Sequence, residues 1–104
     1  MQISAIVALF PDLPEAEVLM WVERGWVRPA QQGEAWTFEE IDVARLRLVR
    51  DLRYGMAVAE ETMPLVLSLL DQVYDMRHRM RAIARAVETQ DEAVRAAVLA
   101  ALRG

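Results

Sequence analysis

The sequence predicts a mostly α-helical protein. Two short helices, a small two-stranded wing and a third helix come first, and a long coiled-coil-type helix and a short C-terminal helix follow. Three observations predict this order. Glycines and prolines divide the chain up to Gly55 into short elements. Bulky and polar residues alternate about Gly33, as in a hairpin. Beyond Pro64, apolar residues recur at alternating spacings of three and four, the pattern of a coiled-coil helix.

Two short helices are expected at the start of the chain. Ile3 to Leu9 form a short apolar segment, and the run Asp12-Leu13-Pro14-Glu15 combines a capping aspartate with a proline in the first helical turn. The second helix should end at Gly25, because glycine tolerates the left-handed conformation that commonly follows a helix. We expect its inner surface to consist of Val18, Leu19 and Val22, with Met20 off that surface.

The wing and a third helix are expected next. The segment from Trp26 to Phe38 predicts two strands joined by a turn at Gly33. Thr37-Phe38-Glu39-Glu40 has the form of a capping box, so the third helix should start there. Arg47 and Asp51 lie one turn apart on this helix and are expected to pair. Its apolar positions are Val43, Leu46, Val49 and Leu52.

A fourth helix is predicted from about Val58 to Glu88, roughly 45 Å long at about 1.5 Å per residue. Its apolar positions form one stripe that we expect to serve in dimerisation or helix packing: Val66, Leu69, Val73, Met76, Met80, Ile83 and Val87. Acidic residues precede the basic ones along this helix, so an antiparallel second copy would set opposite charges side by side. Packing of the chain's own last helix on the stripe is the alternative. That last helix should begin at the capping box Thr89-Gln90-Asp91-Glu92 and present Val94, Val98, Ala101 and Leu102 on one side.

Composition and charge argue against several classes of function. Sixteen carboxylates against twelve arginines give a net charge of -4, which supplies no positive field for general nucleic-acid binding. The chain has no cysteine, and its single histidine, His78, has no second ligand at metal-binding spacing. No nucleophile lies beside a base, so we expect no enzyme, no cofactor and no metal. No segment has the length of a membrane span or the layout of a signal peptide, so we expect a cytoplasmic protein.

The order of elements resembles the winged helix-turn-helix of the MerR type. Gly25-Trp26-Val27-Arg28-Pro29 resembles the exit from a MerR recognition helix, and Ile41 to Val49 is similar to the helix that follows the MerR wing. On this basis residues 1–56 form the MerR-like winged helix-turn-helix. Residues 57–88 form the long helix and residues 89–104 the C-terminal helix of one structural domain.

The MerR resemblance implies a DNA-binding transcriptional regulator, which we keep as the alternative function. MerR proteins place an arginine and tyrosines early in the recognition helix and arginines in the wing. These positions are occupied here by Leu19, Met20 and Trp21 in the helix and by Trp36 and Thr37 in the wing. Residues 1–40 carry two arginines against seven carboxylates, a net charge of -5. Because DNA binding depends on cations that displace counterions from phosphates, this charge disfavours it.

A more specific resemblance is to the chaperone-modulator family, small MerR-like proteins that bind the J domain of a curved-DNA-binding co-chaperone and restrain it. It spans residues 3 to about 85. The resemblance rests on Gly25 to Pro29, on the motif Trp36-Thr37-Phe38 followed by two acids, and on the run Pro64 to Val73. The resemblance implies an adaptor that occupies the basic helical face of the J domain and competes with the main chaperone.

We therefore expect a chaperone modulator that inhibits or tunes a J-domain co-chaperone and forms a homodimer through the long helix. Complementary charge speeds encounter and selects the partner, which favours an acidic contact surface. Trp26 and Trp36 are expected in the core, whereas Trp21 suits a core or an interface equally. The expected partner-binding residues are Glu15, Glu17, Met20, Trp21 and Glu23.

Overall fold

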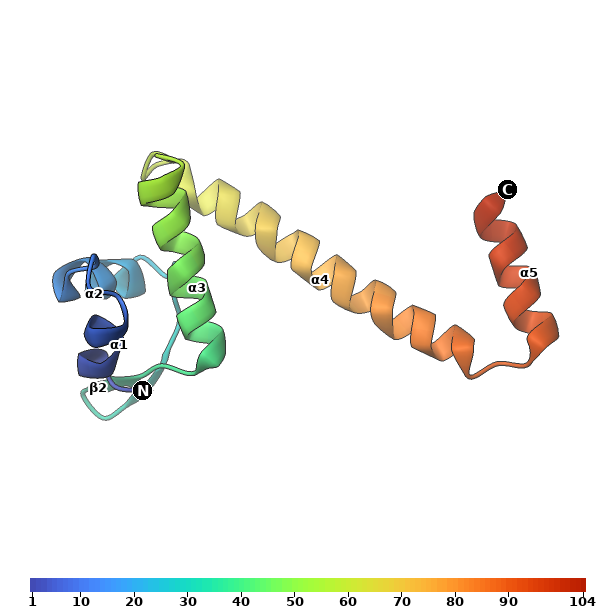
Figure 1. Cartoon of the computed structure of the whole chain (residues 1–104), viewed down its shortest axis with the longest axis horizontal. Helices are drawn as coiled ribbons and strands as arrows, with labels where there is room; N and C mark the ends of the chain where they lie inside the picture. Colours follow the sequence, from blue (N-terminus) through green and yellow to red (C-terminus); the bar gives the residue numbers. More distant parts are fainter. The chain divides into compact units, whose positions relative to one another are not determined.

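The computed structural model describes the whole chain, residues 1–104. In chain order its elements are α1 (Ile3–Leu9), α2 (Glu15–Glu23), β1 (Ala30–Gln32), β2 (Ala35–Thr37), α3 (Glu40–Arg50), the π-helical turn η1 (Asp51–Gly55), α4 (Met63–Glu88) and α5 (Glu92–Arg103) (Figure 1). They form two compact units, Met1–Leu65 and Val66–Gly104. The predicted fold class, mostly helical with a two-stranded wing and a long fourth helix, is confirmed.

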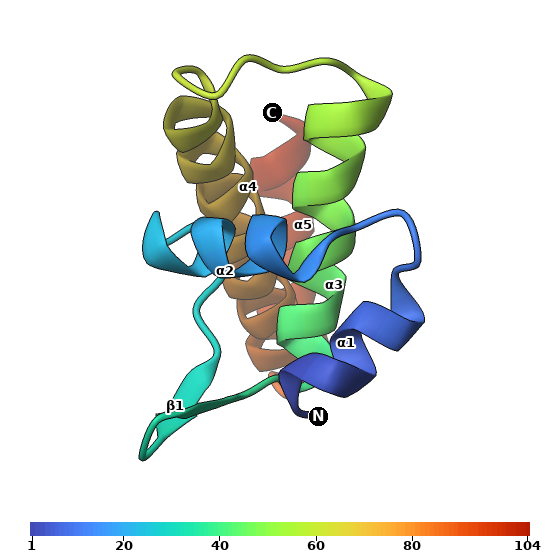
Figure 2. The same cartoon turned by 90° about the vertical axis from the view of Figure 1, so that its left-hand side faces the viewer.

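An apolar core holds the first unit together. Helices α1 and α2 lie on the same side of α3, and the wing extends beyond them (Figure 2). No polar or charged residue is buried, so burial of apolar surface, at about 25 cal/mol per Å², is the main stabilising contribution. The core side chains of this unit are at most 6% exposed: Ile6, Phe10, Leu13, Val18, Trp21, Trp26, Val27, Phe38, Leu46, Val49, Leu52 and Met63.

Helix α2 differs from the prediction at its start and on its inner face. Its N-cap is Pro14, with no side-chain cap, and the Asp12 carboxylate instead lies 3.7 Å from the Arg50 guanidinium. Val18 and Trp21 are the fully buried residues of α2, whereas Leu19 is 38% exposed. The inward placement of Leu19 was therefore wrong, because Val18 and Trp21, three residues apart, define the buried face of α2.

Both turn glycines behave as predicted. Gly25 follows the C-cap of α2 with a φ of 77°, and Gly33 joins the strands with a φ of 64°. The strands pair antiparallel, with Gln31 opposite Trp36. Trp36 is only partly buried, because a two-stranded wing leaves one face uncovered. The expectation that Trp36 belongs to the core is thus met only in part, whereas Trp26 is 5% exposed and buried as expected.

Helix α3 begins later than predicted. Its capping box is formed by Glu39 and Asp42, and the N–H of Glu39 donates to the Asp42 carboxylate at 2.8 Å. Thr37 does not cap the helix, because it belongs to β2 and the next residue, Phe38, is held extended by two hydrogen bonds with Met1.

The expected pair between Arg47 and Asp51 does not form. The Asp51 carboxylate contacts Arg50 at 3.5 Å. Arg47 lies over the Phe10 ring at 5.8 Å, and Arg50 lies over the same ring at 5.2 Å. Stacking on a buried aromatic ring thus replaces the predicted ion pair along the helix.

Helix α4 begins at Met63 rather than near Val58. Pro64 is its second residue, a position at which the missing N–H of proline is not needed for the helix. The preceding residues form a loop, in which the N–H of Val58 donates to the Leu52 carbonyl at 2.9 Å and Ala57 takes a φ of 53°. The helix spans 26 residues, roughly 39 Å at about 1.5 Å per residue.

Helix α5 is capped by Asp91, whose carboxylate accepts a hydrogen bond from the N–H of Val94 at 2.9 Å. Thr89, the predicted cap, donates its hydroxyl to the Ala86 carbonyl at 2.7 Å. No side chain of α5 is buried. Packing of α5 on the apolar positions of its own α4 therefore stays the alternative to a dimer.

Candidate protein-binding surfaces

The outward face of α2 consists of Glu15, Leu19, Met20 and Glu23. Glu15, Leu19 and Glu23 follow one another at intervals of four residues and are all exposed, and the half-buried Met20 lies beside them. The helix presents two carboxylates and two large apolar side chains here and no cation. A surface of this kind attracts a basic partner and offers it apolar contact area.

Leu19 is the member of this face that the sequence analysis missed. Its spacing of four from both Glu15 and Glu23 was the available signal. That spacing was not decisive, because the residues from Val18 to Val22 are all apolar and two different sides of the helix could face the core. Once Val18 and Trp21 are buried, Leu19 lies outward.

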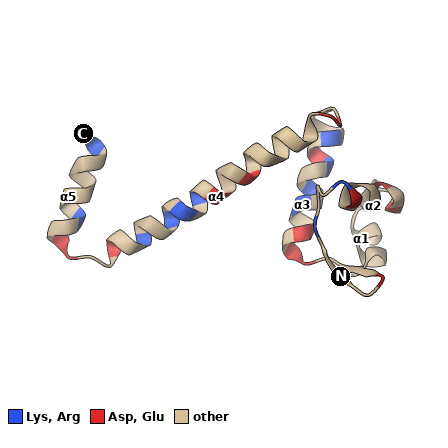
Figure 3. Ribbon diagram, turned by 180° about the vertical axis from the view of Figure 1, so that it is seen from behind, with Lys and Arg blue, Asp and Glu red and all other residues tan.

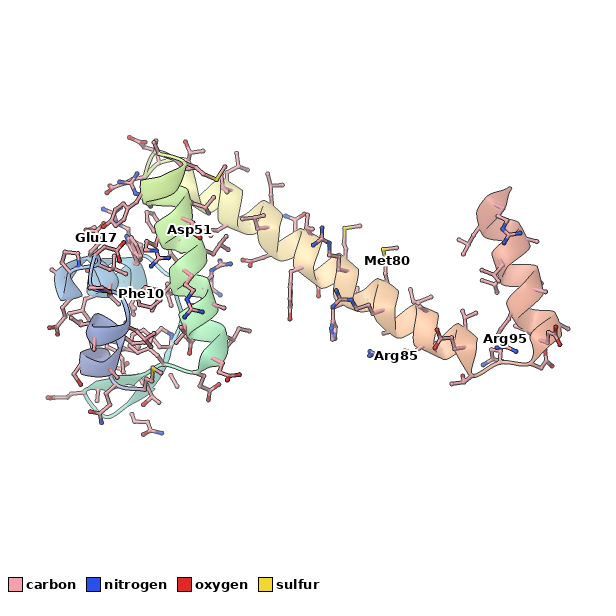
Figure 4. The ribbon with its side chains drawn as sticks, in the orientation of Figure 1. Phe10, Glu17, Asp51, Met80, Arg85 and Arg95 are labelled. Atoms are coloured by element: carbon pink, nitrogen blue, oxygen red, sulfur yellow. The ribbon has the colours of Figure 1, made fainter.

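Glu17 and Trp21 do not lie on the outward face. Trp21 is fully buried, which corrects its assignment to a partner surface, and its ring centroid is 6.1 Å from that of Tyr54. Burial raises the pKa of Tyr54, and the neighbouring Glu17 carboxylate raises it further. Figure 4 labels Glu17 on α2. The carboxylate of the half-buried Glu17 therefore acts on Tyr54 in η1, within the first unit.

The arginine that follows α2 is already paired. Arg24 binds the Glu60 carboxylate at 2.9 Å and lies over the Trp26 ring at 5.3 Å. The hydrogen bond from Arg24, followed by the attraction of its charge, lowers the pKa of Glu60. Arg53 approaches the same carboxylate at 3.5 Å. Arg24 is thus neutralised locally and leaves the outward face of α2 acidic.

The second candidate surface is the α4 stripe, the seven apolar residues from Val66 to Val87 named above. Five of them, Leu69, Val73, Met76, Met80 and Ile83, are between 45% and 66% exposed. Met80 and Arg85 project from opposite sides of the helix (Figure 4). Soluble proteins rarely leave such a continuous apolar surface in water, so this stripe is expected to meet another apolar face.

Charge is divided along α4. Asp71 and Asp75 lie in its first half, and the arginines Arg77, Arg79, Arg81 and Arg85 follow in its second half (Figure 3). Asp75 contacts Arg79 at 3.2 Å, one turn further along the helix. A like copy running in the same direction would place arginines beside arginines, whereas an antiparallel copy would place acids beside arginines.

The remaining chemistry of the chain is limited. No group of three or more histidine, cysteine, aspartate or glutamate side chains is arranged to hold a metal ion. No helix combines the length and apolar character needed to span a membrane.

Helices α1 and α2, the hairpin that follows them, α3 and a long exposed helix define a winged helix-turn-helix protein of the MerR type. The chain belongs to the MerR HTH family regulatory proteins, whose family model matches residues 6–85. No curated protein and no solved structure gives a significant match. Helix α5 lies beyond the matched residues.

Proposed function

We propose that this chain is a non-catalytic cytoplasmic regulator that binds the J domain of a curved-DNA-binding-type co-chaperone and limits its activity. The observation that carries the proposal is the outward face of α2. Where a DNA-reading helix needs cations, this helix presents Glu15, Leu19 and Glu23. The resemblance to the chaperone-modulator family supplies the partner, whose basic helical face complements these charges.

The proposed contact combines two physical effects. The carboxylates of Glu15 and Glu23 steer a basic partner and speed its association. Leu19 and Met20 provide the apolar area that holds the partner after encounter. Competition with the main chaperone for the J domain then follows, because both would occupy the same basic face.

A second candidate, a MerR-type DNA-binding transcriptional regulator, is favoured by the family to which the chain belongs. Arg28 is exposed at the base of the wing and is available to a phosphate. The net charge of -5 over residues 1–40 opposes this function, because the counterion-release term that supplies most DNA affinity would be absent.

The test is calorimetric titration with the purified J domain of the co-chaperone from the same organism, beside a titration with duplex DNA. Saturable binding to the J domain and none to DNA is expected. Changing Glu15→Gln and Glu23→Gln together should slow association at low salt, and the difference should disappear as salt screens the charges. Glu88→Gln with Glu92→Gln changes the net charge equally but lies in the second unit, so it should leave the rate unchanged. Silence toward the J domain with binding to DNA would establish the alternative instead.

We also propose that the protein forms an antiparallel homodimer through the α4 stripe. The support is the exposure of the stripe and the division of charge along α4. Light scattering at micromolar concentration should give twice the mass of the chain, and Met80→Asp should give the mass of one. Ala82→Asp, on the opposite side of the helix, introduces the same charge and should remain dimeric. A monomeric unaltered protein would contradict this proposal.

A further inference from the structure

Helix α5 has an apolar side that the single chain leaves largely exposed. Val94 is 42% exposed and Leu102 is 78% exposed, with the half-buried Val98 between them at intervals of four residues. Ala97 and Ala101 lie beside this row, which permits close approach of another helix. The α5 row, defined as Val94, Val98 and Leu102, therefore requires a partner surface about 12 Å long at about 1.5 Å per residue.

The first half of α4 carries more apolar surface than the α4 stripe can account for. Leu70, 37% exposed, and Tyr74, 67% exposed, lie one turn apart beside the stripe. The positions that continue this flank into the second half of α4 are Arg77 and Arg81. Pairing stripe against stripe would therefore leave Leu70 and Tyr74 in water on each copy.

In an antiparallel α4 pair, α5 of one copy lies near Leu70 and Tyr74 of the other. The stripe is centred near Met76 and Arg77, so the end of one α4 at Glu88 falls opposite the beginning of the other. Only the three residues Thr89 to Asp91 separate α4 from α5. A helix that turns back after so short a connection runs alongside the first half of the second copy's α4, and its midpoint, Val98, falls level with Leu70 and Tyr74.

Charge favours the same placement. Arg95 and Arg103 are the basic residues of α5. Packed on the second half of their own α4 alone, they would join its four arginines. Beside the first half of the second copy's α4, they meet the helix that carries Asp71 and Asp75.

We propose that α5 of one copy packs across Leu70 and Tyr74 of a second copy, so that the two long helices and the two C-terminal helices close into one four-helix assembly. The inference rests on the antiparallel dimer proposed above. It gives α5, which lies outside the residues matched by the family, the function of locking two copies together.

The absence of native cysteine allows a direct test by disulfide formation. A chain with Tyr74→Cys and a size-tagged chain with Val98→Cys are mixed, refolded together and mildly oxidised. The expected product is a covalent pair with the mass of one chain of each kind. Ala100→Cys, on the opposite side of α5, replaces Val98→Cys in the matched control and should give no such pair.

Two results overturn the inference and differ from each other. In the first result, the mixture is dimeric by light scattering, but Val98→Cys gives no more of the mixed covalent pair than Ala100→Cys does. This result would contradict the role of α5 and leave the proposed α4 dimer unaffected. A monomeric protein that gives no mixed pair would remove the dimer and the inference together.

Discussion

Replacing Gly25 by alanine tests how the end of α2 is set. Gly25 has a φ of 77°, and a Cβ added there would meet no atom within 4 Å. The penalty is therefore one of backbone conformation alone, about 1–2 kcal/mol for an L residue held in the left-handed region. Alanine also restricts the unfolded chain, which returns about 0.4–1 kcal/mol. The expected net loss in the free energy of unfolding is about 1 kcal/mol.

The assay is urea unfolding followed by tryptophan fluorescence, with two matched glycines as controls. Gly33→Ala should lose a similar amount, because Gly33 has a φ of 64° and the same free space. Gly55 has the same space without a positive φ, so Gly55→Ala should be neutral or stabilising by up to about 1 kcal/mol. Equal stability of Gly25→Ala and the unaltered chain, or equal losses at Gly25 and Gly55, would refute the reasoning.

Three further changes probe the first unit. Trp21→Ala removes a fully buried side chain and should cost about 3–5 kcal/mol in the free energy of unfolding, by thermal or urea denaturation. Glu60→Gln removes the partner of Arg24. Because the pKa of Glu60 is lowered in the folded state, the stability lost in this variant should be full above the ordinary value of 4.5 and vanish as pH falls through the lowered pKa. Glu17→Gln should lower the pKa of Tyr54 but leave it above 10.0, because burial is the larger cause of the shift. The pKa is measured by absorbance in a chain whose other tyrosine is replaced by phenylalanine, and an unchanged titration would contradict the role of Glu17.

Periodic and conformational signals in the sequence identified most of the fold. Gly25 and Gly33 marked their turns because few other residues tolerate a positive φ. The spacing of the α4 stripe predicted one long helix because apolar residues at three and four positions share a face. Both signals depend only on neighbours along the chain, so no tertiary contact was needed to interpret them.

Helix starts and the inner face of α2 depended on contacts that the sequence does not show. Thr37 has a suitable side chain for a cap, but the pairing of Phe38 with Met1, 37 residues away, keeps the chain extended past it. Asp12 likewise does not cap α2, and its carboxylate pairs with Arg50 instead. In the candidate site, the acids of the outward face of α2 were predicted. Trp21, expected among the partner-binding residues, is buried, and Leu19, expected inside, is exposed, because packing in the core and not local spacing decides which apolar side of α2 is buried.

The two candidate surfaces should respond differently to salt, and this difference separates their functions. The proposed J-domain contact would depend on the exposed carboxylates of α2, whose electrostatic reach is limited to about 10 Å at 0.1 M ionic strength and to about 3 Å at 1 M. The proposed dimer would be held by apolar burial along the α4 stripe, which salt does not screen. Binding of the J domain should therefore weaken as salt rises from 0.1 M to 1 M, while the dimer persists over the same range. A dimer that dissociates in parallel with the J domain would show that the charges along α4, rather than its stripe, hold the two copies together.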